Sequence, residues 1–219
     1  MAGTARRDVI VETSARLFYD YGYPNVGMRM VADHVGIRTA SLYHHFPSKE
    51  QILYEIAVHE TRGFIDVQAP ILDSPLDPAE RLRVLFVNHI VRSWHKRVQL
   101  VVTEREEREL TDEHRAVIVD HKQEYRQLIQ NYLRSLSARR LPAPQTRLLI
   151  VSTLSMINSV NVWFDPTGSL TLDEVADQVG TLAANVMLRA LELPEVAGSP
   201  AVAGSGREKR KPATRRKRA

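Results

Sequence analysis

The sequence contains no cysteine among its 219 residues, and this absence removes several classes of protein at once. Without thiols the chain forms no disulfide scaffold and no thiolate metal site, and nothing in it argues for secretion. A signal peptide is not expected either, because the first residues include two arginines but no uninterrupted apolar segment. We therefore expect a cytoplasmic protein.

Long hydrophobic runs and catalytic motifs are lacking as well. The most apolar stretch, residues 148–164, is interrupted by six Ser, Thr or Asn side chains, so it predicts a buried helix and no contact with a membrane interior. The chain has no P-loop, no Gly-rich dinucleotide turn, no nucleophile elbow and no HExxH motif. Its eight histidines and 26 acidic residues are scattered. We expect no enzyme, no metal site and no cofactor.

Positive charge is scarce outside one end of the chain. The net charge is +4, but the last thirteen residues hold eight Lys or Arg against one acid, so the remainder has three more acidic than basic residues. Gly, Ser, Pro and Ala precede this run from Pro194 onward, and such a segment buries too little apolar surface to fold. We expect residues 194–219 to be a disordered basic tail. It would neutralise phosphates and raise nonspecific affinity, or else only keep the chain soluble.

The chain does contain helical periodicity from end to end, with no alternating, β-branched strand sequence. Start signals are frequent: Ser48 and Thr171 each open a capping box, and Asp77 precedes a proline at the first helical position. These signals predict an all-α fold of about nine helices. The expected helices are residues 5–21, 27–34, 39–45, 48–66, 78–96, 98–109, 112–138, 144–163 and 172–192.

Helix lengths divide the chain into parts. Short, closely spaced helices fill the first 47 residues and longer ones follow, and the composition shifts near residues 62–75. We therefore predict a small N-terminal domain over residues 1–62, a larger domain over residues 63–193, and the tail over residues 194–219.

Residues 27–46 have the spacing of a helix-turn-helix. The first helix has one apolar face at i, i+3, i+4 and i+7, formed by Met28, Val31, Ala32 and Val35. Gly36 follows where a tight turn needs a residue that tolerates positive φ. A second short helix then directs Leu42 and Phe46 inward. In this motif the second helix enters the major groove, so we predict that the chain binds double-stranded DNA.

At this point a family resemblance becomes specific. Residues 7–53 resemble the DNA-binding domain of the TetR family of regulators, above all in Gly36-Ile37 followed by LYHHFPSKE at residues 42–50. The resemblance implies base contacts from the start of the second motif helix, and phosphate or base-edge contacts around it. The residues implied are Arg29, Thr39, Ala40, Tyr43, His44 and Lys49.

Two positions depart from the family pattern. Val26-Gly27 stands where relatives usually have Ser or Thr, so a capping and phosphate-contacting hydroxyl is missing. Arg38 also replaces a Ser/Thr-like residue, and we expect it to contact guanine through two hydrogen bonds from its guanidinium. His44 and His45 are adjacent and point about 100° apart on a helix, so they do not converge on one metal ion. Phe46 is expected in the core, and the Tyr43 hydroxyl is expected to face DNA.

The C-terminal helices are expected to form a dimer interface. Residues 172–192 carry a wide apolar stripe in which Gly180, Ala183 and Ala184 permit close helix contact. In the family, the last two long helices of each subunit form a four-helix interface, which implies residues 144–163 and 172–192 here. The alternative is that both helices pack entirely within one subunit.

The middle helices are expected to enclose a ligand cavity with apolar walls and few polar groups. The candidate residues are Phe86, His89, Ile90, Trp94, His121, Tyr125, Leu128, Asn158, Asn161 and Trp163. Ordinary core packing is the alternative for each of them. The charged part of residues 98–110 is expected to be a solvated face.

A second resemblance concerns the effector. WFDP at residues 163–166, with the charged stretch at residues 103–110, is similar to actinobacterial TetR-type regulators of fatty-acid and steroid catabolism, many of which respond to acyl-CoA thioesters. Some of these place an arginine where this chain has Val162. An acyl-CoA, another hydrophobic or aromatic effector, and no effector all remain open.

The predicted function is a homodimeric repressor that a small molecule releases from a palindromic operator. Ligand binding would favour a state in which the helix over residues 48–66 pivots and the two recognition helices no longer match successive grooves. The alternative is an architectural DNA-binding protein without an effector, which would have a packed C-terminal core and no cavity.

Overall fold

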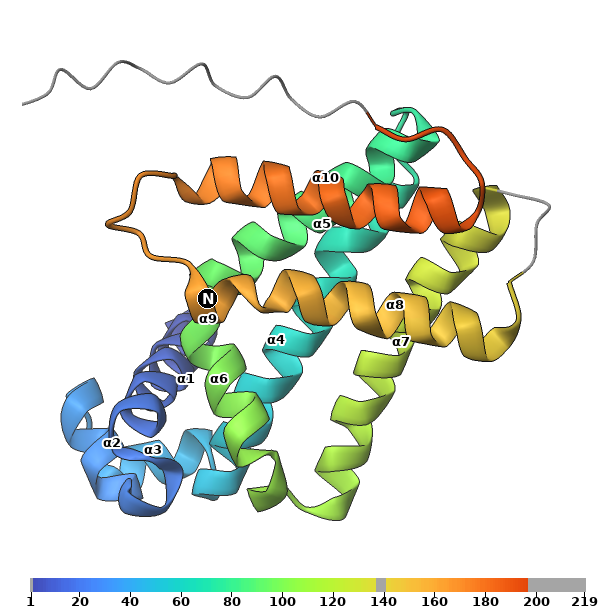
Figure 1. Ribbon diagram of the computed structural model, residues 1–219. Coiled ribbons are helices and arrows are strands. Elements are labelled where there is room, and N and C mark those ends of the chain that lie inside the picture. Colours follow the sequence, from blue (N-terminus) through green and yellow to red (C-terminus); the bar gives the residue numbers. More distant parts are fainter. Residues whose placement is uncertain (1, 137–140, 197–219) are drawn as a thin grey trace, which may run out of the picture.

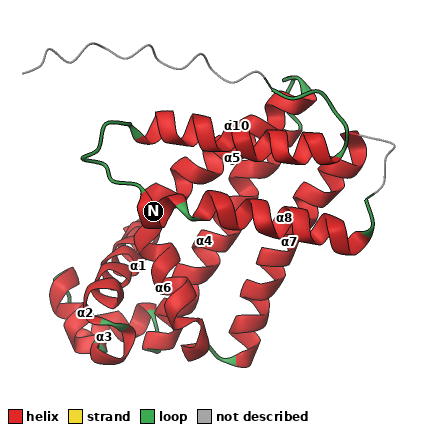
Figure 2. Cartoon of the chain, in the orientation of Figure 1, coloured by secondary structure: helices red, strands yellow, loops and turns green. Residues whose placement is uncertain are grey.

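The computed structural model describes residues 2–136 and 141–196, and within these ranges all regular structure is helical, which confirms the predicted all-α fold. The α-helices are α1 (Ala2–Tyr21), α2 (Met28–Val35), α3 (Thr39–His45), α4 (Lys49–Leu72), α5 (Pro78–His95), α6 (Arg97–Glu106), α7 (Asp112–Leu136), α8 (Ala143–Asn158), α9 (Val160–Trp163) and α10 (Leu172–Ala190). Two short 3-10 helices, η1 (Tyr23–Asn25) and η2 (Glu107–Glu109), lie between them. Short loops connect most neighbours (Figure 2). The predicted tail lies largely outside the described residues.

The N-terminal unit has a hydrophobic core formed by α1 to α3 and the first half of α4 (Figure 1), to which Val102 of α6, Leu110 and Ile118 of α7 also contribute. Val31, Ala32, Leu42 and Phe46 are fully buried in it, as the helix-turn-helix spacing predicts. Gly36 ends α2 in the left-handed conformation, with φ 74° and ψ 37°. An L residue with a Cβ adopts this conformation at a cost, so glycine suits the turn.

Side-chain caps fix where several helices begin. The Ser48 hydroxyl accepts a hydrogen bond from the Gln51 N–H at 3.0 Å, and Asp77 accepts one from the Ala79 N–H at 2.9 Å. Thr171 and Glu174 form both halves of a capping box. These contacts satisfy N–H groups that the first helical turn leaves without partners. They explain why the predicted starts of α4, α5 and α10 agree with the structure to within a residue.

α4 runs further than its sequence pattern indicates, from Lys49 to Leu72, and so passes the predicted end at residue 66. Its first half contributes Ile52 and Leu53 to the N-terminal core, while Ile65 and Leu72 are buried in a second, C-terminal core. Burial in this second core stabilises the extra turns despite Pro70. One helix therefore connects the two units.

The single helix predicted over residues 144–163 is two helices, α8 and α9, separated at Ser159. The Ser159 hydroxyl donates to the Met156 carbonyl at 2.6 Å and accepts from the Trp163 Nε1–H at 3.1 Å. A serine that bonds to nearby groups in this way competes with the regular helical ladder. Asn158 and Asn161 consequently lie on either side of a break.

α10 packs closely along α5, as the small residues in its stripe predict. Gly180 allows a close approach to Val87 of α5. Ala183 and Ala184 are fully buried, whereas Leu182 and Val186 are 54% and 40% exposed. The stripe thus has an inner part that packs within the subunit and an outer part that does not.

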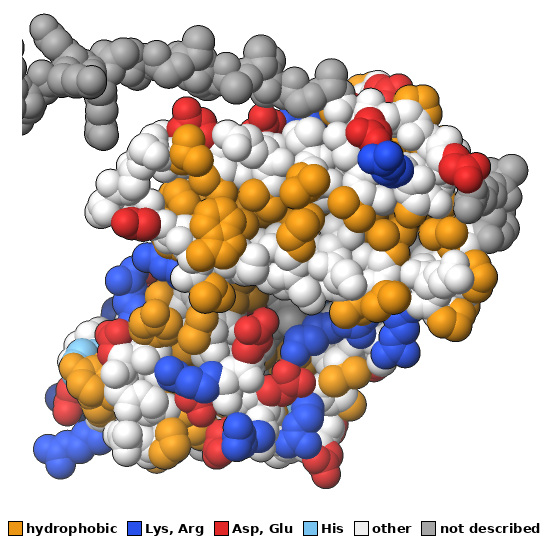
Figure 3. All heavy atoms as spheres, viewed as in Figure 1, with side chains coloured by type: hydrophobic (Ala, Val, Ile, Leu, Met, Phe, Trp, Pro, Cys, Tyr) orange, Lys and Arg blue, Asp and Glu red, His pale blue; other side chains and the backbone are white. Residues whose placement is uncertain are grey.

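The outer surface of α8, α9 and α10 carries several exposed hydrophobic side chains. Leu148, Val162 and Leu182 are 67%, 88% and 54% exposed. Figure 3 shows hydrophobic side chains gathered over these helices in the upper part of the view. Such a contiguous patch is typical of a subunit interface. No described helix has the length and apolar character that crossing a bilayer requires.

Gly180→Ala should lower the free energy of unfolding by about 1–3 kcal/mol, measured by urea unfolding. A Cβ at this position would lie 2.7 Å from Val87 Cγ2 and 2.9 Å from the Val87 backbone nitrogen. Gly27→Ser is the matched control, because a Cβ there meets no atom within 4 Å and serine can cap α2. Equal stability of the two variants would contradict the close contact between α5 and α10.

Candidate functional site

The residues that the resemblance assigns to DNA surround the turn between α2 and α3. This turn lies at the end of the molecule opposite α10 (Figure 1). Exposed side chains at this surface are Arg29, Arg38, Ala40, Tyr43 and His44, and Thr39 is half-buried. Thr39 and Tyr43 are one helical turn apart, as are Ala40 and His44, so α3 presents one continuous outer face. Their contact with DNA stays a prediction.

Arg38 occupies the position immediately before α3. Its backbone is extended, with φ −70° and ψ 143°, and its side chain makes no cap. Within the described ranges the guanidinium has no hydrogen bond or ion pair. Tyr43 is 52% exposed, whereas Phe46 is fully buried. The recognition helix therefore has a buried side that fixes it and an outer side with a cation left unpaired.

At this surface one helix cap is absent, and one predicted DNA-contacting side chain binds within the protein. α2 begins after Gly27, which provides no side-chain cap, as the departure at Val26-Gly27 indicates. The Lys49 ammonium donates to the Tyr23 carbonyl at 2.7 Å and lies 4.0 Å from the centre of the Tyr23 ring. Burial lowers the pKa of Lys49, against the opposing effect of Glu109 and Glu106. The predicted phosphate contact of Lys49 would require its ammonium to leave Tyr23.

Arg7 was not anticipated from the sequence, yet it holds the end of the recognition helix. Its Nη1 donates to the His45 carbonyl at 2.9 Å, its Nη2 donates to Glu55 at 2.9 Å, and its guanidinium lies 4.1 Å from the Phe46 ring centre. A cation at a helix C-terminus is favourable because the last carbonyls carry partial negative charge. Its partners are far away in sequence, so no local pattern could have identified it.

The C-terminal unit contains a cavity of about 380 Å³ that is lined by residues of six helices, α4 to α9. Much of its wall is apolar. The hydrophobic lining residues are Phe64, Leu100, Val101, Tyr125, Val151, Leu154 and Val162. A cavity of this size with largely apolar walls has the properties of a small-molecule site.

A hydrogen-bonded chain of three side chains lies in the cavity wall. The Tyr125 hydroxyl and His89 Nδ1 are 2.9 Å apart, and His89 Nε2 and Asn158 Oδ1 are 2.8 Å apart. Since an amide oxygen only accepts, Nε2 carries the ring proton and Nδ1 accepts from the Tyr125 hydroxyl. Burial lowers the pKa of His89 from 6.5 to about 4, and the hydrogen bond to Asn158 opposes this only in part. His89 is therefore neutral near pH 7.

Two further polar atoms of the cavity lining have no partner in the protein. Ser93 is 1% exposed, and its hydroxyl has no hydrogen bond. The buried Oδ1 atom of Asn161 also has no hydrogen bond. A buried polar atom without a partner costs free energy. These two atoms are available to a bound molecule.

The charged lining residues are mostly cationic. They are Arg97, Glu104, Lys122 and Arg126. Lys122 pairs with Glu107 at 2.6 Å, and the Arg97 guanidinium lies 4.5 Å from the Trp94 ring centre. In the part of the chain that the structure describes, Arg126 has no acidic partner. This positive surplus favours a ligand with negative charge at one end.

Five of the ten predicted ligand residues line this cavity, and five do not. The lining ones are His89, His121, Tyr125, Asn158 and Asn161. The other five lie elsewhere, and a ligand contact from any of them stays a prediction. Phe86 and Ile90 are buried inside the core, Leu128 faces a separate groove between α4 and α7, Trp94 packs edge-on against Phe164, and Trp163 is 54% exposed. Helical spacing identifies a buried face, but it does not reveal which part of that face borders an empty space.

Part of the lining was not predicted. Thr61 and Phe64 come from α4, in which no ligand-binding residue was expected. α6 contributes Arg97, Leu100 and Glu104, although its charged part was expected to be a solvated face. The mixture of apolar and charged residues in α6 was the available signal, because a helix at the rim of a cavity needs both.

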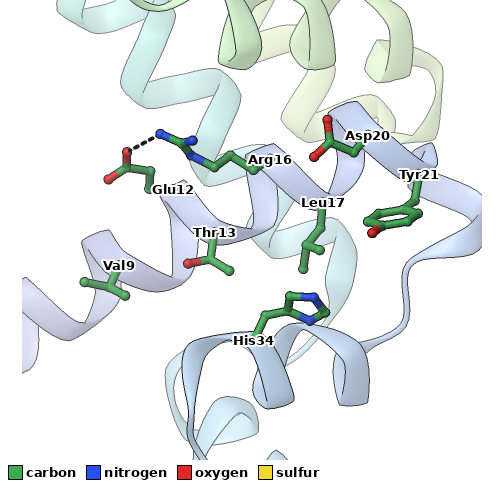
Figure 4. Close-up of a pocket in the computed structure, with 8 residues that line it drawn as sticks. All are labelled: Val9, Glu12, Thr13, Arg16, Leu17, Asp20, Tyr21 and His34. Carbon is green, nitrogen blue, oxygen red and sulfur yellow. Dashed lines mark ion pairs between the residues drawn. The ribbon is translucent and has the colours of Figure 1, made fainter.

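A second hollow, of about 320 Å³, lies between α1 and α2, and Figure 4 shows its lining. Its surface includes the exposed Val9 and Tyr21 and an ion pair between Glu12 and Arg16, with 3.5 Å between the charged atoms. His34 Nδ1 is already 2.8 Å from the Met30 carbonyl. Among its described lining residues, this second hollow has no buried polar atom without a partner, unlike the cavity lined by α4 to α9. No group of three potential metal ligands occurs among the described residues.

Comparison with known proteins gives consistent matches in both units. A family model described as "Bacterial regulatory proteins, tetR family" matches residues 10–56, and one described as "Tetracyclin repressor-like, C-terminal domain" matches residues 75–187. The HTH-type transcriptional repressor KstR2 of Mycolicibacterium smegmatis is 30% identical over 181 residues, which cover 80% of this chain and 86% of the relative.

Solved structures agree with this over most of the chain. AibR in complex with isovaleryl coenzyme A and operator DNA is 30% identical, with a TM-score of 0.68 over 81% of this chain and 97% of that chain. KstR2 of Mycobacterium tuberculosis is 27% identical, with a TM-score of 0.69 over 82% and 93% of the two chains.

His89 should make stability depend on pH in a defined direction. The folded protein keeps His89 neutral down to about pH 4, whereas the unfolded chain takes up a proton near pH 6.5. Stability is therefore present above pH 6.5 and is lost as the pH falls towards 4. Between about pH 7.5 and about pH 5 we expect the wild type to lose about 2 kcal/mol more unfolding free energy than His89→Gln, measured in urea. Parallel pH profiles would contradict a buried neutral His89.

Proposed function

The chain belongs to the TetR family of regulators, and from this premise we propose that it is a repressor released from its operator by an acyl-CoA thioester. As a member of this family it is a ligand-responsive DNA-binding transcription regulator. The observation that carries the proposal is the cavity, which combines apolar walls, buried polar atoms without partners and a cationic surplus. An acyl-CoA has the matching parts: an apolar chain, a thioester carbonyl and phosphates.

The charge anchor for CoA comes from different helices than the second resemblance indicates. Val162 stands where some related regulators have an arginine, and it is 88% exposed. Arg97, Lys122 and Arg126, on α6 and α7, supply cations to the same cavity. The structure of AibR contains isovaleryl coenzyme A and operator DNA, and this supports the same class of effector for the present chain.

The dimer follows from the short reach of α3. A seven-residue helix contacts few bases, so one copy gives limited specificity. Two copies about one helical turn of DNA apart read a palindromic site. We assign the exposed apolar surface of α8, α9 and α10 to the contact between the two subunits.

The structure offers two connections by which a ligand could act on the DNA-binding unit. α4 lines the cavity with Thr61 and Phe64 and is buried in the N-terminal core. α6 lines the cavity as well, and its Arg105 donates to the Phe18 carbonyl at the end of α1. A ligand that fits one placement of these helices better than another shifts the population between the two placements.

No finding favours the alternative of an architectural protein without an effector. That alternative predicts a packed C-terminal core without a cavity, whereas the structure contains one. We further propose that the chain has no catalytic role and acts in the cytoplasm, since the matching curated relatives are transcriptional repressors.

Arg38→Ala should weaken binding to the preferred operator by about 10- to 100-fold and should relax preference at one base position in each half-site. Arg29→Ala is the comparison, because loss of a phosphate contact weakens binding to all DNA sequences alike and reduces the salt dependence of binding. Operators selected from random DNA, followed by titrations at several salt concentrations, provide both measurements. Unchanged base preference in Arg38→Ala would contradict direct readout by this residue.

Octanoyl-CoA should release the operator, and Arg126→Gln should raise the concentration needed by roughly tenfold. Arg108→Gln is the matched control, since Arg108 is an exposed cation outside the cavity lining. Fluorescence anisotropy of labelled operator measures the release. If a series of straight-chain, branched and aromatic acyl-CoA esters all leave the operator bound, the proposed effector class is wrong.

A further inference from the structure

The three-residue chain in the cavity wall fixes the direction of its hydrogen bonds. Asn158 Oδ1 accepts from the His89 Nε2–H, and His89 Nδ1 accepts from the Tyr125 hydroxyl, at 2.8 and 2.9 Å. These contacts use the hydroxyl proton of Tyr125 and the amide oxygen of Asn158. The Asn158 amide N–H₂ and the lone pairs of the Tyr125 oxygen therefore take no part in the chain.

His89 is neutral at physiological pH, so it donates only one of these two hydrogen bonds and accepts the other. It is buried, and the rings of Phe64 and Tyr125 lie 4.8 and 5.7 Å from its own ring centre. Burial holds the pKa of His89 near 4, so the ring stays neutral with a single proton. Burial also raises the pKa of Tyr125, which keeps its hydroxyl protonated as the donor to His89.

The same wall contains an acceptor and donor without any protein partner. The Ser93 hydroxyl is on α5, one turn beyond His89, and has no hydrogen bond although Ser93 is 1% exposed. A hydroxyl both donates and accepts, so it can join whatever group meets the chain of three. This independent observation indicates that the polar part of the wall is completed by a ligand.

We propose that Tyr125, His89 and Asn158 act as a selectivity relay that reads a carbonyl group of the effector, with the Asn158 amide donating to the carbonyl oxygen. His89 is a positioning residue, because it orients Asn158. The apolar chain then lies against Leu100, Leu154 and their neighbours. The inference rests on the proposed effector site, but the relay requires only a carbonyl beside an apolar group and no CoA.

Two probe pairs separate these claims. Octanoyl-CoA and its thioether analogue S-octyl-CoA differ only in the carbonyl oxygen, and S-methyl thiooctanoate and methyl octyl sulfide form the same pair without CoA. Each is titrated into the full chain with calorimetry or intrinsic fluorescence. Because one hydrogen bond is gained, we expect the carbonyl member of each pair to bind roughly tenfold more tightly.

Variants assign that preference to the relay. Asn158→Leu should reduce the tenfold ratio to about one, and His89→Phe should reduce it in the same direction by freeing the Asn158 amide. Leu100→Ala is the matched control, since it should weaken both members of a pair and leave their ratio unchanged. The ratio does not change when a variant is merely less stable, and operator binding reports that each variant is folded.

The outcomes distinguish the relay from the effector class. A preference for the thioester in the CoA-free pair without binding of either CoA compound supports the relay and overturns the acyl-CoA proposal. Binding of both CoA compounds with equal affinity overturns the relay and leaves the effector class standing. A ratio that persists in Asn158→Leu also overturns the relay, and no binding of any of the four probes overturns both.

Discussion

The packing of α4 in two hydrophobic cores at once is the constraint on which the rest of the structure depends. Ile52 and Leu53 are fully buried with the DNA-binding unit, and Ile65 and Leu72 are buried with the ligand-binding unit. Removing a large side chain from either core costs about 2–5 kcal/mol, so α4 cannot detach from one unit to follow the other. A displacement of α4 at the cavity must therefore reach the N-terminal unit or be absorbed by repacking.

The contact between α4 and α5 beside the cavity leaves buried polar groups incompletely paired. Glu60 is 2% exposed, and its nearest cations, Arg92 and Lys96, are 3.6 and 3.8 Å away. Its Oε2 has no hydrogen bond, and burial raises the pKa of this carboxyl. Arg92 also lies over the ring of Phe64, which borders the cavity. Buried charges paired this loosely contribute little net stability, so alternative placements of α4 against α5 cost less here than elsewhere.

Local patterns in the sequence predicted the helices, their caps and the inward face of the helix-turn-helix, because each depends on neighbours within about four residues. The cavity was predicted only in part. Phe86 and His89 have the same helical periodicity, yet one fills the core and the other borders the empty space. The contacts of Arg7 and Lys49 join residues 26 to 48 positions apart, and no pattern along one helix contains that information.

The two functional regions share a property that distinguishes them from the structural ion pairs. Arg83 and Arg62 bridge helices through carboxylates, and those contacts are complete within the protein. Arg38 beside α3 and Arg126 at the cavity have no such partner among the described residues, and Ser93 has an unused hydroxyl. A chain gains no folding stability from leaving these groups unsatisfied, which is consistent with the proposed partners: DNA for Arg38, and an anionic, carbonyl-bearing effector for Arg126 and Ser93.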